Sequence, residues 1–189
     1  MELFRAARCG NSDAVKHLLA TGNWSGRQTW QALSVAAAND FAGTVTVMLA
    51  AKIGPNHTCR PQVSPYSKIP TLPSSTALFW AASFGATDSI RALLDGRAHV
   101  EGCGSGWRAT ALGIASRKGH ICAVKALLAS NAKPDGFVAF GSYNPVNEAK
   151  ASGHKRIAAL LLAQVAKTNV VPTNGVPPKS VQTITDSSI

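Results

Sequence analysis

The stretch TALFWAASFG, residues 76–85, recurs 34 residues later as TALGIASRKG, residues 110–119. Small residues in the middle of each stretch, such as Ala81-Ala82, allow a helix to pack closely against a neighbouring helix. The closing glycine, Gly85 or Gly119, can adopt the left-handed conformation that ends a helix. Each stretch therefore predicts a short helix of about two turns that stops at its glycine.

The same pattern occurs five times along the chain. Each copy begins with an apolar residue, continues into a second apolar stretch and ends that stretch in a hydrophobic pair. The first residue and the pair are 15 positions apart in four copies and 14 in the last. The first residues are Leu3, Leu33, Leu78, Leu112 and Val146, and the pairs are Leu18-Leu19, Met48-Leu49, Leu93-Leu94, Leu127-Leu128 and Leu160-Leu161. Successive copies begin 30, 45, 34 and 34 residues apart, which indicates a repeat protein.

The second stretch of each copy also has helical spacing of its apolar residues, as in Ile90, Leu93 and Leu94. A polar turn follows it, for example Asp95-Gly96-Arg97-Ala98. A single helix-turn-helix unit cannot bury its apolar face alone. Neighbouring units are therefore expected to stack into a solenoid.

These copies resemble ankyrin repeats, whose repeat of about 33 residues carries T-P-L-H-x-A-A before a glycine and a G-A-D turn after the second helix. The resemblance rests on residues 76–82 and 110–116 for the first motif, on Gly119-His120 and Gly153-His154 for its Gly-His, and on residues 131–135 for the turn. It implies an all-α ankyrin-repeat solenoid of about five helix-turn-helix repeats with short β-turn fingers. The repeats are expected near residues 1–24, 27–53, 73–100, 107–135 and 141–165, which makes residues 1–165 an ankyrin-repeat domain.

The copies depart from the ankyrin pattern in two respects. None keeps the Pro or the His of T-P-L-H, and Asp40 stands where copy 2 should have its helix-ending glycine. The resemblance gives His120 and His154, which follow two of the other glycines, a structural hydrogen-bonding role.

Two segments fall outside the repeats. Residues 54–75 form a Pro-rich insertion, because the step from copy 2 to copy 3 exceeds 34 by 11 residues and the prolines exclude helix through most of it. The insertion is either a loop that projects from the binding face or a tolerated surface segment. Residues 166–189 are expected to be a disordered C-terminal tail.

The composition fits a mostly helical protein with a surplus of positive charge. Hydrophobic residues make up 46% of the chain, and 19 Lys and Arg against nine Asp and Glu give a net charge of +10. Nine basic and two acidic residues lie between Arg108 and Lys167, so much of the surplus is in the last two repeats. This charge favours an acidic partner, whether protein, nucleic acid or anionic membrane, or it is only a solvated basic face.

The cysteines and the start of the chain indicate a cellular compartment. Cys9, Cys59, Cys103 and Cys122 have no CxxC spacing, and Cys9, Cys103 and Cys122 have no His at an activating spacing, so reduced and buried structural thiols are expected. The first residues do not form a secretory signal, and no apolar stretch approaches the roughly 20 residues that span a membrane. We therefore expect a cytoplasmic protein, with the nucleus as a further location.

No group of residues has the spacing of a catalytic or cofactor site. The glycine-rich segment Gly102–Gly106 lacks the preceding strand and the long following helix of a phosphate-binding loop. His57 and Cys59 offer two metal ligands, whereas a site needs three or four. We expect no enzymatic activity, no cofactor and no metal.

The ankyrin resemblance also places the expected binding residues, at the finger tips and at the exposed end of the first helix of each repeat. The expected finger residues are Arg27, Gln28, Trp30, Trp107, Arg108, Phe140 and Tyr143, and the expected helix residues are Arg8, Cys9, Asn39, Phe84, Arg117 and Lys118. Together they would form a concave strip of arginine and aromatic residues, which are enriched at binding hot spots. Trp80, inside a first helix, is expected in the core.

These observations predict a monomeric, non-catalytic adaptor or scaffold. Its concave ankyrin surface would bind another protein through an acidic or amphipathic segment of that partner. Two alternatives stay open: a protein associated with nucleic acid or acidic lipid, and a docking module of a larger enzyme or effector. A steep loss of binding with salt would favour the first alternative.

Overall fold

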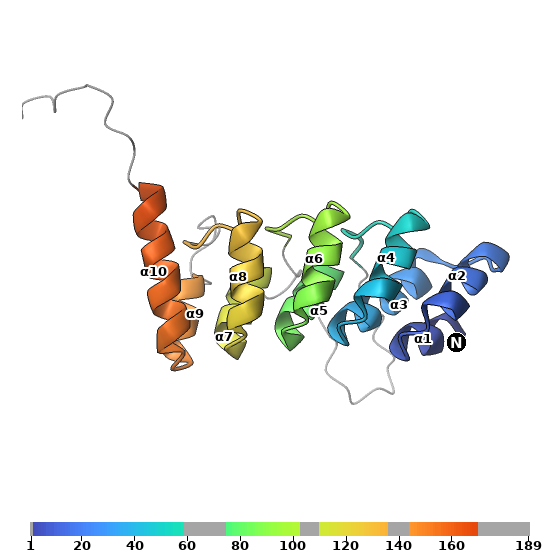
Figure 1. The fold of residues 1–189 in the computed structure, drawn as a ribbon, viewed down its shortest axis with the longest axis horizontal. Coiled ribbons are helices and arrows are strands. Elements are labelled where there is room, and N and C mark those ends of the chain that lie inside the picture. The colour runs from blue at the N-terminus through green and yellow to red at the C-terminus, as the bar shows by residue number, and fades with distance from the viewer. Residues whose placement is uncertain (1, 59–74, 103–109, 136–143, 170–189) are drawn as a thin grey trace, which may run out of the picture.

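The computed structural model describes residues 2–58, 75–102, 110–135 and 144–169, and these residues form helices and turns without a strand. The helices are α1 (Glu2–Arg8), α2 (Ser12–Thr21), α3 (Gly26–Ala38), α4 (Ala42–Ala50), α5 (Ala77–Phe84), α6 (Thr87–Asp95), α7 (Ala111–Lys118), α8 (Ile121–Ala129), α9 (Pro145–Ala151) and α10 (Lys155–Asn169). Consecutive helices form pairs that stack along the long axis of the molecule, from α1 and α2 to α9 and α10 (Figure 1). The all-α prediction is confirmed.

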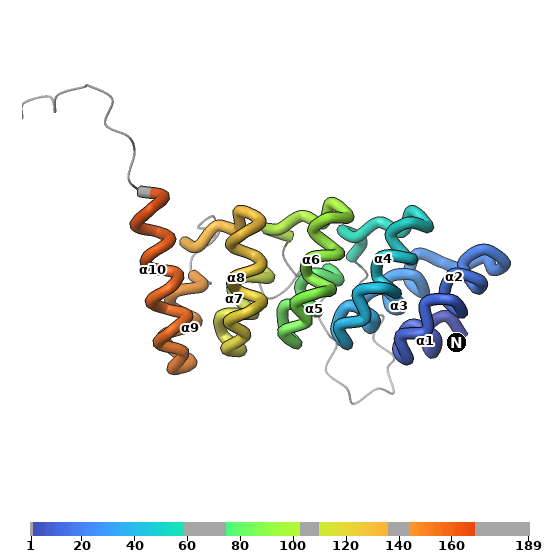
Figure 2. Tube along the Cα trace, in the orientation of Figure 1, coloured from blue at the N-terminus to red at the C-terminus, as the bar shows by residue number. Residues whose placement is uncertain are grey.

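The pairs stack so that like helices are neighbours. The first helix of each pair packs against the first helix of the next, in the order α1, α3, α5, α7 and α9. The second helices α2, α4, α6 and α8 pack in the same order, which makes a second layer (Figure 2). This arrangement gives each layer one face toward the other layer and one face toward solvent.

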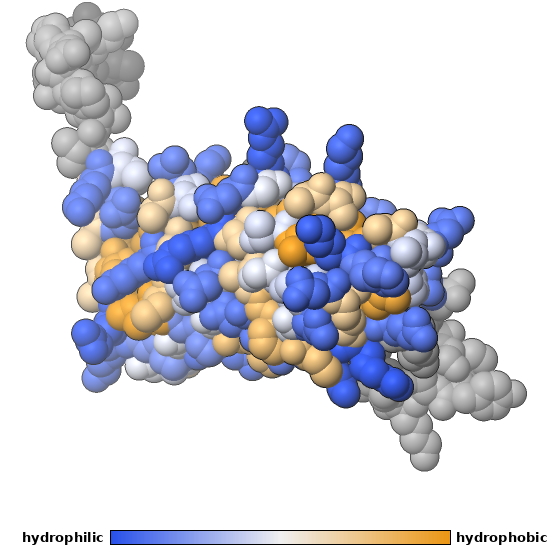
Figure 3. Space-filling model, turned by 45° about the vertical axis from the view of Figure 1, so that its right-hand side comes forward, coloured by the Kyte–Doolittle hydropathy of each residue, from blue (hydrophilic) through white to orange (hydrophobic). Residues whose placement is uncertain are grey.

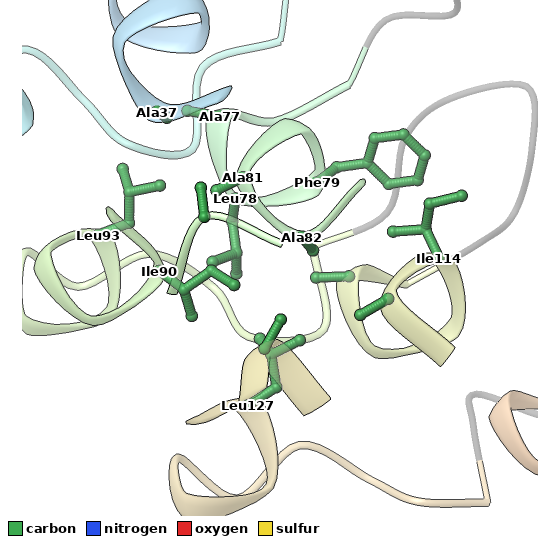
Figure 4. Close-up of a cluster of buried hydrophobic side chains, with 14 of the residues drawn as sticks. Ala37, Ala77, Leu78, Phe79, Ala81, Ala82, Ile90, Leu93, Ile114 and Leu127 are labelled. Atoms are coloured by element: carbon green, nitrogen blue, oxygen red, sulfur yellow. The ribbon is translucent and has the colours of Figure 1, made fainter. Parts of the chain in front are cut away.

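Small and branched apolar residues fill the space between the layers. Leu78 of α5, Ile90 of α6 and Leu127 of α8 point into the same space between two helix pairs, and all three are fully buried (Figure 4). Alanines such as Ala82, also fully buried, allow the first helices to approach closely. Burial of one large apolar side chain contributes about 1.5–3 kcal/mol, so the periodic leucines are the main source of stability.

Each of the first helices is followed, within two residues of its end, by a residue with a positive φ. These residues are Gly10, Asp40, Gly85, Gly119 and Gly153, with φ between 60° and 83°. The predicted glycine stops are therefore confirmed, and Asp40 adopts the same left-handed conformation in copy 2. Asp is one of the few residues that tolerates this region, because its short side chain can form local hydrogen bonds.

The two histidines of the Gly-His pairs join consecutive repeats. His120 Nε2 lies 3.1 Å from the carbonyl oxygen of Ser83, and His154 Nε2 lies 3.1 Å from that of Arg117. The structural hydrogen-bonding role that the resemblance gave to these residues is confirmed. Phe41 takes the corresponding place against Gly10 by ring contact.

Further polar contacts between repeats come from the turns. Asp40 Oδ1 accepts a hydrogen bond of 2.8 Å from the Ser89 amide, near the start of α6. Asn56 donates to the Arg97 carbonyl oxygen and accepts from the His99 amide, at 3.2 and 2.7 Å. The turns thus hold the repeats in register along the edge of the stack.

The second copy differs from the prediction at its start. α3 begins at Gly26, so Arg27, Gln28 and Trp30 lie in the helix and not on a finger. The cause is a capping box, in which the Ser25 side chain accepts from the Gln28 amide and the Gln28 side chain accepts from the Ser25 amide. This reciprocal pair satisfies backbone groups that a helix start otherwise leaves unpaired, and so it starts the helix early.

The boundaries of the insertion and the tail also shift. α10 continues to Asn169, four residues beyond the predicted end of the domain, because Ala and Lys favour helix there. Residues 54–58 belong to the turn after α4, and Ser75 is fully buried just before α5. The rest of the predicted insertion, residues 59–74, and residues 170–189 of the predicted tail lie outside the described residues.

Two cysteines are placed differently from the prediction. Cys9 and Cys122 are exposed free thiols and not buried structural ones. Cys9 immediately follows α1, and Cys122 lies in the first turn of α8 on its solvent side. Cys59 and Cys103 lie outside the described residues.

Candidate partner-binding surface

The solvent side of the layer formed by α1, α3, α5, α7 and α9 is here called the first-helix face. Arg8, Asn39, Phe84 and Lys118 all lie at or just beyond the C-terminal ends of first helices, and all four are exposed. Because neighbouring first helices pack side by side, these residues follow one edge of the face from α1 to α7. The structure therefore places four of the expected helix residues along one edge.

A hollow of about 380 Å³ opens on this face across α1, α3 and α5. We call it the aromatic hollow, and its lining consists of Phe4, Trp30, Gln31, Ser34, Val35, Ala38, Asn39, Trp80 and Phe84. Three expected residues, Trp30, Asn39 and Phe84, are brought together here from two helix pairs.

The aromatic rings of the hollow stay in contact with solvent. Phe84 is 61% exposed and Phe4 is 39% exposed, which is unusual for such large apolar side chains. Trp80 stacks on Phe84 with ring centroids 6.4 Å apart and planes 25° apart. Trp80 also meets the buried Phe79 edge to face, with ring centroids 6.1 Å apart. The exposed ring is thus supported by a continuous aromatic contact that reaches the core.

The prediction that Trp80 lies in the core is wrong. Its side chain is only partly buried and lines the hollow. Leu78 and Ala82, on the other side of α5, fill the core. Trp80 precedes Phe84 by four residues, so the two share the outward side of the helix.

Trp30 is held in place by a contact that is distant in the sequence. Its indole Nε1 donates a hydrogen bond of 3.0 Å to the carbonyl oxygen of Ser75, 45 residues away. Trp30 belongs to a helix only because α3 starts early, at Gly26, and so includes the residues that precede Leu33. The hydrogen bond fixes the ring at the border between α3 and α5.

Polar groups in the hollow are few. The Asn39 amide nitrogen donates to the carbonyl oxygen of Val35 at 2.8 Å, within its own helix end. Ser34 is only 8% exposed, and its hydroxyl has no hydrogen-bond partner among the described residues. The hydroxyl oxygen is itself buried, so it does not present a hydrogen-bonding group to the open hollow.

Charge is arranged around the hollow and not within it. The stretch of α3 from Gln28 to its end and the whole of α5 contain no charged residue. The flanking helices carry cations, among them the exposed Arg8 on α1 and Lys118 on α7. Neither of these two forms an ion pair within the described ranges, whereas Arg91 pairs with Asp88 on α6 at 2.9 Å. The face is therefore apolar at its centre and positive toward the neighbouring helices.

The remaining expected residues have different positions. Gln28 lines a second hollow of about 340 Å³ beside the first, which shares Phe4 and Gln31 with it. Arg27 is exposed at the start of α3, and Arg117 is partly buried at the end of α7. Trp107, Arg108, Phe140 and Tyr143 lie outside the described residues.

Six lining residues were missed by the sequence reasoning, namely Phe4, Gln31, Ser34, Val35, Ala38 and Trp80. A signal for three of them was present. Phe4, Val35 and Trp80 each precede an expected binding residue by four positions, so they lie on the same side of the same helix.

Among the described residues no helix is long and apolar enough to cross a membrane. Nor do the described His, Cys, Asp and Glu side chains form a group of three that could hold a metal ion.

Comparison with known proteins identifies one family. A family model described as ankyrin repeats, with three copies, matches residues 47–137 and 78–174, which together make up more than half of the chain. No curated protein matches the sequence.

Proposed function

Because the chain belongs to the ankyrin-repeat family, we propose that it is a non-catalytic adaptor that binds another protein through its first-helix face. Ankyrin repeats are generally protein–protein interaction modules and are typically non-catalytic. The observation that carries the proposal is the aromatic hollow, whose exposed rings gather from three repeats.

Exposed aromatic side chains of this kind are unfavourable, because their apolar surface is in contact with water. Large contiguous apolar patches on a protein surface mark interaction sites, and aromatic residues with arginine dominate binding hot spots. Phe84 at 61% exposure and Phe4 at 39% would lose this exposure beneath a partner. Full burial of a fully exposed ring contributes about 1.5–3 kcal/mol, and the parts of these two rings that are still exposed would contribute correspondingly less to binding, before the entropic costs of association.

Contacts within the protein hold two of the rings of the hollow, which favours affinity. Trp30 donates its hydrogen bond to Ser75, and Trp80 contacts both Phe79 and Phe84. A binding surface that is already in place loses less conformational entropy when the partner docks. We therefore place the adaptor site at the hollow and along the edge from Arg8 to Lys118.

A second function, association with nucleic acid or acidic lipid, is favoured by the net charge of +10. We rank it lower because the described cations are spread over both layers, for example Lys16 on α2 and Lys125 on α8, and not gathered into one patch. The chain could also be the docking module of a larger enzyme or effector, and in that role it would bind through the same surface and the same contacts.

The proposal is tested by affinity capture from lysate of cells that express the protein, at moderate and at high salt. The bait is the wild-type chain, a double variant Phe4→Ala and Phe84→Ala, or a control Leu162→Ala. Leu162 is a matched control because it is an exposed large apolar residue, at 46%, on α10 and away from the hollow.

The expected result is a discrete protein that stays bound at high salt to the wild type and to the Leu162 control, and that the double variant loses. Recovery of nucleic acid or lipid alone, lost at high salt and indifferent to Phe4 and Phe84, would refute the adaptor and favour the electrostatic function.

A further inference from the structure

We propose that the aromatic hollow receives an apolar anchor side chain from an acidic segment of the partner, and that carboxylates on either side of this anchor pair with Arg8 and Lys118. The inference rests on the proposed adaptor function and adds the chemistry of the segment that binds. It follows from the pattern of apolar and charged residues across four adjacent first helices.

The centre of the surface selects an uncharged, bulky side chain. The rings of Trp30, Trp80 and Phe84 line it, and neither α5 nor the part of α3 beyond Arg27 carries a charge. A volume of about 380 Å³ is at the small end of ordinary ligand pockets, which measure about 300–1,000 Å³. Such a hollow suits large side chains of a partner, and a charged side chain there would lose its hydration without gaining an ion pair.

The flanks of the surface select negative charge. Arg8 follows Phe4 by four residues on α1, so its side chain lies on the side of α1 that reaches the hollow. Lys118 occupies the position on α7 that Phe84 occupies on α5, one helix further along the stack. Both are exposed and are without an ion pair among the described residues, so a carboxylate can reach either one.

No acidic side chain among the described residues pairs with Arg8 or Lys118. Asp40 lies at the end of α3, but its Oδ1 accepts from the Ser89 amide on α6. Glu2 stands at the opposite end of α1 from Arg8. Between Arg8 and Lys118, α3 and α5 thus carry no carboxylate within their bounds, and the carboxylate that follows α3, that of Asp40, accepts from the Ser89 amide.

The spacing of the helices sets the length of the segment. α1, α3, α5 and α7 are consecutive neighbours, and packed helix axes lie about 8–10 Å apart. The axes of α1 and α7 are then about 25–30 Å apart, which an extended chain covers in about eight or nine residues. The anchor belongs near the middle of this length, with acidic residues toward both ends.

The test is a selection from a phage-displayed library of random peptides about 12 residues long, against the full chain. The enriched peptides are then synthesised, and their binding is measured by fluorescence polarisation. Three variants are compared with the wild type: Phe84→Ala, the double reversal Arg8→Glu with Lys118→Glu, and the double reversal Lys16→Glu with Lys125→Glu. The last is matched to the second in charge, but its residues are exposed on α2 and α8 of the second layer.

We expect enriched peptides with a central aromatic or large aliphatic residue flanked by Asp or Glu. Phe84→Ala should weaken their binding about tenfold or more, and the Arg8 and Lys118 reversal should do the same. The Lys16 and Lys125 reversal should change it less than about threefold, because it alters only the long-range field.

Other outcomes overturn the inference in distinguishable ways. Peptides without acidic residues whose binding is still lost in Phe84→Ala would refute the acidic segment and leave the adaptor function intact. Peptides that bind equally to the wild type and to all three variants would refute both the inference and the first-helix face as the adaptor site. A selection without any enriched peptide would overturn the inference.

Discussion

The Cα atom of Gly85 lies directly against the imidazole of His120, so that a Cβ atom at residue 85 would stand 2.7 Å from His120 Nδ1. Gly85 ends α5 with a φ of 72°, and His120 lies just before α8 in the next repeat. Gly119 and His154 repeat the arrangement one step further along the stack. Consecutive repeats are therefore joined where one has no side chain and the next has an aromatic ring.

Gly85→Ala should lower the free energy of unfolding by about 2–3 kcal/mol. A left-handed conformation costs a non-glycine residue about 1–2 kcal/mol, and the new methyl group would also displace the His120 ring and weaken its hydrogen bond. Urea unfolding followed by circular dichroism measures this change. Gly54→Ala is the control, since that glycine lacks a positive φ and its Cβ would meet nothing within 4 Å, and it should change stability by less than about 0.5 kcal/mol.

Gly153→Ala separates the two causes, because Gly153 has a φ of 78° but its Cβ would meet nothing within 4 Å. It should cost about 1 kcal/mol, less than Gly85→Ala. In a His120→Ala background the extra cost of Gly85→Ala should shrink toward this value, since the ring is gone. Equal costs for Gly85→Ala and Gly153→Ala in the wild type would show that the ring contact carries no energy.

Substitutions of Asp40 should fall in the order Asn, Gly, Ala from least to most destabilising. Asp40 Oδ1 accepts from the Ser89 amide and so caps α6, whose own N-cap residue Ala86 has no side-chain hydrogen bond. The Asn variant keeps a side-chain acceptor for the Ser89 amide and tolerates the φ of 60°. The Gly variant loses the acceptor but adopts this φ easily, and the Ala variant has no acceptor and does not tolerate this φ. The loss should be about 1 kcal/mol for Gly and about 2 kcal/mol for Ala, again from urea unfolding. A Gly variant more stable than the Asn variant would show that the hydrogen bond to the Ser89 amide contributes less to the free energy of unfolding than the backbone conformation at residue 40.

Phe84→Ala should leave the stability within about 0.5 kcal/mol of the wild type, whereas Leu78→Ala should cost about 2–5 kcal/mol. Both residues belong to α5, but Phe84 is 61% exposed and Leu78 is fully buried. Thermal and chemical denaturation of the two variants measure the difference. A large loss in Phe84→Ala would mean that its stacking on Trp80 serves the fold and not a partner.

Thr76→Ala and Thr110→Ala should each cost about 1–2 kcal/mol, and the Ser variants much less. The Thr76 hydroxyl accepts from the Phe79 amide at 3.2 Å, and the Thr110 hydroxyl accepts from the Gly113 amide at 3.1 Å. Both are buried, so water cannot replace the lost acceptor. Unfolding experiments on the four variants test this, and an equal loss in the Ser and Ala variants would assign the effect to the threonine methyl group.

The helix pairs, their stops and their stacking could all be predicted from the sequence alone. Leu78, Leu93 and their equivalents recur at a constant spacing, and glycines such as Gly85 stand at the same place in each copy. Helix periodicity and the conformational freedom of glycine act within one or two turns, so these features can be read without knowledge of neighbours. The ankyrin resemblance then followed from the same residues.

The outward residues that come together to form a surface could be identified only from the packed repeats. Trp80 and Leu78 are both apolar residues of α5, and their burial differs because one side of the helix meets α6 and α8 while the other meets solvent. Trp30 reaches Ser75 from 45 residues away, and Asp40 caps a helix of the next repeat. Such contacts form because the stacking of repeats brings together residues that are far apart in the sequence. Local sequence patterns act within one or two helical turns and so carry no information about which distant residues meet.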